Sequence, residues 1–186
     1  AKRLSFEFAV QEEPRGTADA VAAAESFAAG DHFVMLNSDN YYPLVALEAL
    51  RVADGAAVAL FERESMLQGN IPEDRLRQFA VAKIDEAGNL ARILEKPSPE
   101  TLAGLPRPHW IGMNCWRFGP EIFQACRAIG PSPRGELEIT DAVQHTIDVL
   151  GCPFRAVQVC APVLDPSSRR DVAPIASRLA SLEVDF

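Results

Sequence analysis

Residues 34–43 read Val-Met-Leu-Asn-Ser-Asp-Asn-Tyr-Tyr-Pro, an apolar run that ends in a polar cluster. The apolar run from Phe33 to Leu36 is too short for a helix and predicts a strand that is buried on both faces. In open α/β sheets, ligands bind beyond the carboxyl ends of the strands. Asp39, at the tip of the polar cluster, is therefore the first candidate for a functional residue.

Segments with strand and helix periodicity alternate on both sides of this stretch. We expect strands at residues 3–10, 33–36, 56–61, 78–84, 90–94, 110–118 and 154–163, and helices at 18–29, 43–53, 99–105, 120–129, 139–150 and 171–182. Residues 62–74 are polar and mixed, and we expect a long surface connection there. The alternation predicts one α/β domain spanning residues 1–186, with a mostly parallel sheet.

Composition narrows the classes of partner. The 186 residues carry a formal net charge of −8, which argues against nonspecific binding to nucleic acid or to an anionic membrane surface. No stretch reaches the roughly 20 apolar residues of a membrane span. The 4 cysteines show no CxxC spacing and are expected to be reduced thiols of a cytoplasmic protein.

Six short motifs occur in order along nearly the whole chain. They are Gln11-x-x-Pro14-x-Gly16-Thr17-Ala18-x-Ala20, Asp39-Asn40, Glu95-Lys96-Pro97, Pro120-Glu121-Ile122-Phe123, Arg134-Gly135-Glu136-Leu137-Glu138-Ile139-Thr140-Asp141 and Asp165. In order and spacing they resemble the sugar-1-phosphate nucleotidyltransferases, also called sugar-nucleotide pyrophosphorylases. The resemblance implies a Rossmann-like three-layer α/β/α architecture, the nucleotide-diphospho-sugar transferase fold.

The resemblance also implies a reaction. A nucleotidylyl group passes from an NTP to a hexose-1-phosphate, giving an NDP-sugar and pyrophosphate. The sugar phosphate itself attacks the α-phosphorus, so catalysis consists of positioning and charge neutralisation and needs no protein nucleophile. The sequence agrees, because it shows no Ser-His-Asp or Cys-His constellation. Members of this family commonly form homo-oligomers, and we expect the same here.

The charged motif residues match a metal site and a phosphate site in the family. Asp39 and Asp165 match the two carboxylates that bind Mg²⁺, and Lys96 and Arg134 match the cations on the sugar phosphate. We expect Asp39 and Asp165 to face one cleft, with their carboxylates within about 10 Å of each other. Glu95, Lys96 and Arg134 should lie on the same side of the molecule.

The remaining motif residues match substrate contacts. Gln11 and the backbone of Gly16 match positions that read the nucleobase edge, and they favour UTP or dTTP. Glu95 matches a carboxylate that accepts hydrogen bonds from sugar hydroxyls, and Asn40 is expected to touch the sugar. Each of these residues also has a purely structural interpretation, as a strand end, a turn residue or a solvated charge. The same holds for the predicted metal and phosphate ligands of the preceding paragraph.

The sequence departs from the family pattern in several places, of which two matter most for function. Nothing at the N-terminus matches the family's GxGTR-like loop, which wraps the triphosphate and is followed by a lysine. We therefore expect the N-terminal part of the nucleotide-binding half to be missing. Ala80 stands where the family often has a glycine beside the sugar, and its methyl group is expected to narrow the pocket or to shift specificity.

Two other functions stay open. The absent loop favours a non-catalytic sugar-nucleotide-binding or regulatory subunit with the same fold. A GT-A-type glycosyltransferase is the weaker alternative, because it needs a DxD-like pair and residues 37–39 supply one carboxylate, that of Asp39.

Overall fold

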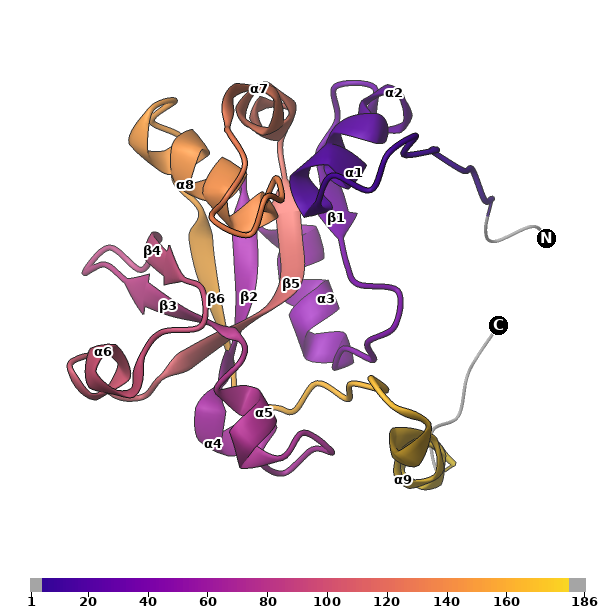
Figure 1. Cartoon of the computed structure of the whole chain (residues 1–186), viewed down its shortest axis with the longest axis vertical. Helices are drawn as coiled ribbons and strands as arrows, with labels where there is room; N and C mark the ends of the chain where they lie inside the picture. The colour runs from indigo at the N-terminus through magenta and orange to yellow at the C-terminus, as the bar shows by residue number, and fades with distance from the viewer. Residues whose placement is uncertain (1–4, 181–186) are drawn as a thin grey trace.

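The computed structural model describes residues 5–180, and its strands form one 6-stranded sheet in the order β4-β3-β5-β2-β6, with β1 also pairing with β5 (Figure 1). The strands are β1 (Phe33–Met35), β2 (Ala57–Glu62), β3 (Ala80–Ile84), β4 (Leu90–Leu94), β5 (Trp110–Phe118) and β6 (Arg155–Val159). The helices are α1 (Thr17–Ala23), α2 (Glu25–Ala28), α3 (Leu44–Val52), α4 (Arg63–Met66), α5 (Glu73–Leu76), α6 (Pro99–Ala103), α7 (Glu121–Ala128), α8 (Ile139–Asp148) and α9 (Arg169–Leu179).

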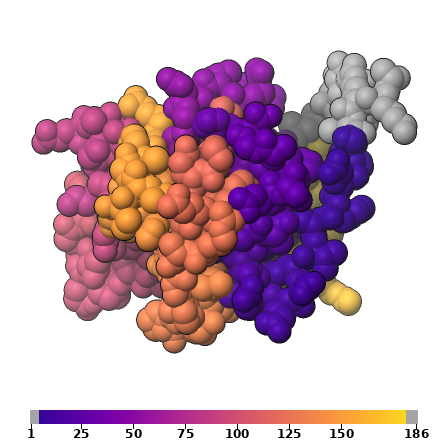
Figure 2. Space-filling view, turned by 90° about the horizontal axis from the view of Figure 1, so that it is seen from above, coloured from indigo at the N-terminus to yellow at the C-terminus, as the bar shows by residue number. Residues whose placement is uncertain are grey.

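Helices cover both faces of the sheet, as the three-layer prediction requires. Helices α1, α2, α7 and α8 pack on one face, which we call the α8 face, and α3, α4 and α5 pack on the other, the α3 face. Figure 2 shows α7 and α8, in salmon and orange, beside the indigo N-terminal segment that contains α1. Strand β2 is buried on both sides because Val58 and Leu60 point to the α8 face whereas Ala59 and Phe61 point to the α3 face. The predicted α/β class is confirmed.

The direction of the strands corrects the sequence-based expectation of a mostly parallel sheet. Strand β5 pairs in antiparallel fashion with β1, β2 and β3, and β3 pairs in the same way with β4. Among the described strands, only β2 and β6 form a parallel pair. Hydrophobic periodicity is the same for both directions, so it does not reveal that β5 lies between strands that run opposite to it.

Two further expectations about strands were wrong. Residues 5–10 form no strand, and Phe6 and Phe8 are 80% and 93% exposed; the first two residues of the predicted strand, 3 and 4, lie outside the described part. Strand β1 is not buried on both faces, since Val34 is 39% exposed. Among the described strands β1 pairs only with β5, so its outer edge lacks the neighbour that a buried strand has.

The predicted connection at residues 62–74 also differs, because it contains α4 and the beginning of α5. These short helices bury Met66 and Leu76 against the α3 face. Throughout residues 5–180, no helix has the length and apolar character needed to cross a membrane.

A gap in the strand pairing positions the candidate site. Strands β1 and β3 lie end to end along the same edge of β5, with Met35 opposite Trp116 and Ala80 opposite Gly112. Residues 113–115 of β5 therefore have no strand partner on that edge. The carboxyl end of β1 points toward this gap.

Candidate functional site

A small pocket of about 110 Å³ opens at the gap in the edge of β5, and we call it the gap pocket. It brings together side chains from segments far apart in the sequence. Its lining includes Asn37, Ala80, Glu95, Gly112, Asn114 and Thr140. The structure thus places the predicted sugar-binding residue Glu95 beside the carboxyl end of β1, and the methyl group of Ala80 narrows the same pocket.

Asn114 is a pocket residue that the motif comparison missed. It lies in the middle of β5 with φ of 51°, a left-handed conformation that Asn adopts more readily than most residues. The indole Nε1 of Trp116 donates to Oδ1 of Asn114 at 3.3 Å. Because an indole N–H can only donate, the oxygen of the carboxamide must face Trp116. The Asn114 NH₂ group is left as a donor, with no partner among residues 5–180.

Glu95 and Thr140 supply the other polar groups of the pocket. Thr140 Oγ1 is buried and has no hydrogen-bond partner among the described residues. Desolvation raises the pKa of Glu95 above its usual range, and the negative charge of Glu138 adds to this. The Thr140 hydroxyl and the cations Arg134 and Lys96 act in the opposite direction. A carboxylate acceptor, an amide donor and a free hydroxyl in one small pocket suit a ligand with several hydroxyl groups.

A buried tyrosine holds the polar end of β1 against β5. The hydroxyl of Tyr42 donates to the backbone oxygen of Met113 at 2.6 Å, and it accepts from the backbone N–H of Asn37 and from Nδ2 of Asn40. Burial raises the pKa of Tyr42 to about 12, so it stays a neutral donor at physiological pH. The predicted sugar contact Asn40 is therefore fixed next to the pocket by Tyr42, which the sequence comparison did not identify.

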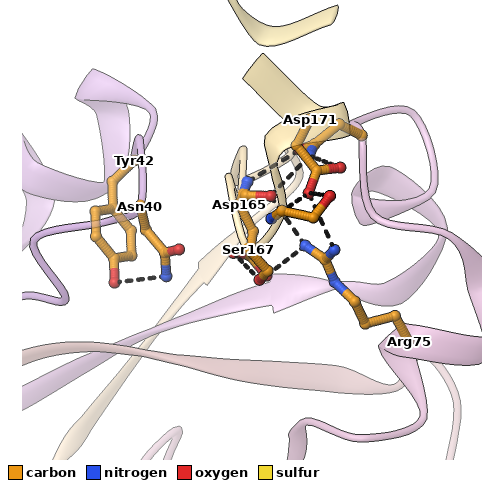
Figure 3. Close-up of polar contacts among 8 residues, drawn as sticks. Asn40, Tyr42, Arg75, Asp165, Ser167 and Asp171 are labelled. Carbon is orange, nitrogen blue, oxygen red and sulfur yellow. Dashed lines mark hydrogen bonds and ion pairs between the residues drawn. The ribbon is translucent and has the colours of Figure 1, made fainter.

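Both carboxylate oxygens of Asp165 are engaged (Figure 3). Oδ2 lies 2.6 Å from Nη2 of Arg75, and Oδ1 accepts from the hydroxyl of Ser167 at 2.6 Å. Asn70 bonds the backbone of Asp165 on both sides, donating to its oxygen at 2.8 Å and accepting from its N–H at 2.9 Å. Asp165 is only 5% exposed, and its position is fixed by these contacts.

The segments of the two predicted metal ligands lie side by side. Tyr41 and Leu164 exchange two backbone hydrogen bonds, of 2.9 and 3.0 Å. Asp39 is two residues before this bridge, and Asp165 follows it directly. The separation of the two carboxylates stays a prediction.

The two carboxylates differ in their readiness for a metal ion. The Asp39 side chain is exposed and has no hydrogen-bond or ion-pair partner within residues 5–180, whereas Asp165 has no free carboxylate oxygen. In that part of the chain, no three His, Cys, Asp or Glu side chains form a cluster that could hold a metal. The chemistry of two carboxylates fits Mg²⁺, but the arrangement of Asp165 does not.

The two predicted phosphate-binding cations both lie close enough to Glu95 to lower its pKa, but they make different contacts. Arg134 lies near Glu95 but forms an ion pair with Glu138, with Nη2 2.7 Å from Oε1. Lys96 has φ of 42° and lines a different, larger cavity. Glu95 and Lys96 are adjacent in sequence, yet they line separate cavities.

The predicted nucleobase residues contact each other. The Gln11 side-chain nitrogen donates to Gly16 O at 3.1 Å and to Oδ2 of Asp19 at 2.7 Å. Gly16 has φ of 129°, and an added Cβ would lie 2.5 Å from the backbone oxygen of Leu137. Glycine is therefore required at position 16 for packing, whether or not it contacts a base.

Known proteins of one family match most of this chain. The family model for nucleotidyl transferases matches residues 1–150. The low-salt glycan biosynthesis nucleotidyltransferase Agl11 of Haloferax volcanii is 36% identical over 150 residues, which cover 78% of this chain and 37% of that protein. A glucose-1-phosphate thymidylyltransferase of Streptomyces griseus is 32% identical over 145 residues, covering 78% of this chain and 38% of that protein.

Solved structures show the same fold. A UDP-glucose pyrophosphorylase from Acinetobacter baumanii superimposes with a TM-score of 0.71 at 17% identity, covering 96% of this chain and 61% of that one. A UDP-glucose pyrophosphorylase complexed with UDP-glucose gives 0.69 at 17% identity, covering 91% and 64%.

These matches define the class of protein to which the fold and the site belong. The chain is a member of the nucleotidyl transferase family, and the resemblance to sugar-1-phosphate nucleotidyltransferases is confirmed. It spans less than two fifths of the length of the two curated relatives.

Proposed function

We propose that the chain is part of an enzyme that transfers a nucleotidylyl group from an NTP to a hexose-1-phosphate. The observation that carries this proposal is the gap pocket, where the Glu95 carboxylate, the Asn114 NH₂ group and the Thr140 hydroxyl line one small cavity and keep unused hydrogen-bonding capacity. Buried polar groups need hydrogen-bond partners, and the hydroxyl groups of a sugar would supply them.

The reaction fits residues that bind and orient. An oxygen of the sugar phosphate attacks the α-phosphorus of the NTP, the bond from that phosphorus to the bridging oxygen breaks, and pyrophosphate leaves with the bonding electrons. Glu95 and Asn114 would hold the sugar, and Asn40 would border it. Arg134 would turn from Glu138 to the sugar phosphate, since a planar guanidinium matches two phosphate oxygens. Lys96 would join it there after leaving the larger cavity.

The nucleotide is proposed to be UTP or dTTP. The relatives include glucose-1-phosphate thymidylyltransferases and a UTP–glucose-1-phosphate uridylyltransferase, AglF of Haloferax volcanii. Gln11 would read the base with the oxygen of its side-chain amide, because the amide nitrogen already donates to Gly16 and Asp19.

The family generally uses a divalent metal ion, and we propose Mg²⁺ with Asp39 as a ligand. A bound Mg²⁺ would neutralise phosphate charge. Asp165 is proposed as the second ligand, in competition with its ion pair to Arg75. We also propose a cytoplasmic location, because the cysteines are all free thiols, at positions 115, 126, 152 and 160. We further propose that the protein self-associates, which light scattering can measure.

The test is a panel of NTPs against sugar-1-phosphates with the full-length protein, with pyrophosphate release as the readout. We expect the highest turnover with UTP or dTTP and glucose-1-phosphate. Glu95→Gln should raise KM for the sugar phosphate, and Glu86→Gln, in the β3–β4 turn, is a matched control that should not. Absence of pyrophosphate release with every pair would refute the proposal.

A non-catalytic sugar-nucleotide-binding subunit is the second candidate. The pairing of Asp165 with Arg75 favours it, because the carboxylate is already neutralised by a protein cation. Saturable binding of UDP-glucose or dTDP-glucose to the full-length protein, without turnover of any pair, would establish this function instead.

A further inference from the structure

A second, larger cavity of about 640 Å³ lies between α5, α6 and the strands β3 and β5. It shares Gln78 with the gap pocket, but the rest of its lining is different. Val81 and Ile111 line the second cavity, whereas their neighbours Ala80 and Gly112 line the gap pocket. Successive residues of a strand point to opposite faces, so the two cavities lie on opposite faces of the sheet. The second cavity belongs to the α3 face.

Cations gather around this cavity although the chain as a whole has a net charge of −8. Its lining includes Arg63, Arg77, Lys96 and Arg107 but only one carboxylate, that of Glu73. Arg63 and Arg77 share Glu73, at 2.7 and 3.3 Å. Arg63 also pairs with Glu64, at 2.9 Å, whereas Lys96 and Arg107 form no ion pair within residues 5–180.

A buried histidine provides an independent indication of a ligand. His109 lines the second cavity and is only 9% exposed. Its Nε2 atom is buried and has no hydrogen-bond partner in the described part of the chain. Leaving such a group unpaired costs free energy, and an oxygen atom of a bound molecule would satisfy it.

The rest of the lining is apolar. Leu76, Val81, Leu102 and Ile111 contribute aliphatic side chains. The volume lies within the range of about 300–1,000 Å³ that is usual for small-molecule sites. Guanidinium groups favour phosphate because their N–H donors match its oxygens in pairs.

We propose that the second cavity binds an organic phosphate whose apolar or aromatic body rests on the aliphatic residues. The phosphate contacts Arg107, and His109 Nε2 bonds one of its oxygens. This site lies on the face opposite to the gap pocket, and it does not depend on the function proposed above.

The probe is phenyl phosphate, titrated into the full-length protein and followed by NMR and calorimetry. We expect saturable binding in the millimolar range or tighter, with resonance shifts at Leu102 and Ile111 rather than at Asn114 and Thr140. Phenol, which lacks the phosphate, should bind far more weakly.

Two variants and one matched control complete the test. Arg107→Gln and His109→Phe should each weaken binding about tenfold, because each removes a hydrogen bond to a charged group. Arg92→Gln, which changes an exposed arginine of β4 that pairs with Asp148, should bind as the wild type does. Far-UV circular dichroism checks that each variant is folded.

The proposal is overturned by any of several results. These are no saturable binding of phenyl phosphate, equally tight binding of phenol, or wild-type affinity in both folded variants. Shifts confined to Asn114 and Thr140 would also overturn it, because the probe would then occupy the gap pocket.

Discussion

Nη2 of Arg75 lies 2.6 Å from Oδ2 of Asp165, and it also donates to the backbone oxygen of Asp165 at 2.9 Å. The two residues are 90 positions apart in the sequence. The contact ties α5 to the segment that follows β6, and it neutralises a carboxylate that is almost fully buried. Asp165 therefore has a structural role in addition to any role with a metal.

Arg75→Gln is expected to destabilise the fold. Removing one partner of a buried ion pair typically costs about 3–5 kcal/mol, and we expect about 2–3 kcal/mol because the Arg75 side chain is 25% exposed. Urea unfolding followed by circular dichroism measures the change in the free energy of unfolding. Arg92→Gln, in the exposed pair with Asp148, should cost less than about 1 kcal/mol. Equal costs for the two variants would contradict the prediction.

The same variant tests whether Asp165 can bind a metal. If Mg²⁺ and Arg75 compete for this carboxylate, Arg75→Gln should bind Mg²⁺ more tightly than the wild-type protein, as measured by calorimetry. Asp39→Asn should weaken binding in both backgrounds. Unchanged affinity in Arg75→Gln would show that Asp165 is not a ligand and that the arginine pair is its only role.

Asn114 is expected to contribute both to local backbone geometry and to sugar binding. Asn114→Ala should be about 1 kcal/mol less stable than Asn114→Gly, since a Cβ is unfavourable in the left-handed region. Both variants lose the amide donor, so the Kd for glucose-1-phosphate should rise about three- to tenfold in each.

Asn114→Asp separates these two effects. It keeps an oxygen for the Trp116 indole, removes the NH₂ donor that faces the pocket, and adds a negative charge beside Glu95. It should weaken glucose-1-phosphate binding at least as much as Asn114→Gly does. Wild-type affinity in Asn114→Asp would exclude a role for Asn114 in recognising the sugar.

The raised pKa of Glu95 predicts a pH dependence. As the pH falls, Glu95 becomes protonated at a higher pH than an ordinary glutamate, and it then loses its charge as an acceptor for sugar hydroxyls. In the pH range where Glu95 becomes protonated, the Kd for glucose-1-phosphate should rise in the wild-type protein but not in Glu95→Gln.

The raised pKa of Glu95 also predicts how the stability of the fold changes with pH. A carboxyl group whose pKa is raised by folding makes the folded state less stable as the pH increases through that pKa. Glu95→Gln removes this cost, so it should gain stability relative to the wild type at pH 7 but not at pH 3. Urea midpoints at the two pH values measure it. A gain at pH 3 alone would reverse the predicted sign.

Much of the fold could be predicted from local patterns. The apolar run that became β2, the hairpin of β3 and β4, the long strand β5 and the amphipathic helices α7 and α8 all have the predicted type. Their periodicity depends on neighbouring residues in the sequence. The edge of the sheet was predicted less well, because burial of a strand such as β1 depends on whether another strand lies beside it.

Part of the candidate site could also be predicted. The motifs indicated Glu95 and the polar end of β1, and the structure places both at the gap pocket. Asn114 carried only a weak signal, a lone amide inside an apolar strand. Arg75 had none, because its partner is distant in the sequence.

The sequence by itself determined the family, the alternation of strands and helices, and the residue types that could bind a sugar phosphate. Only the tertiary structure decided the direction of β5, the ion pair between Asp165 and Arg75, and the placement of the neighbours Glu95 and Lys96 in different cavities. The reason is physical: side-chain chemistry and periodicity are local properties of the chain. Strand pairing, ion pairing and cavity lining depend on which distant segments meet.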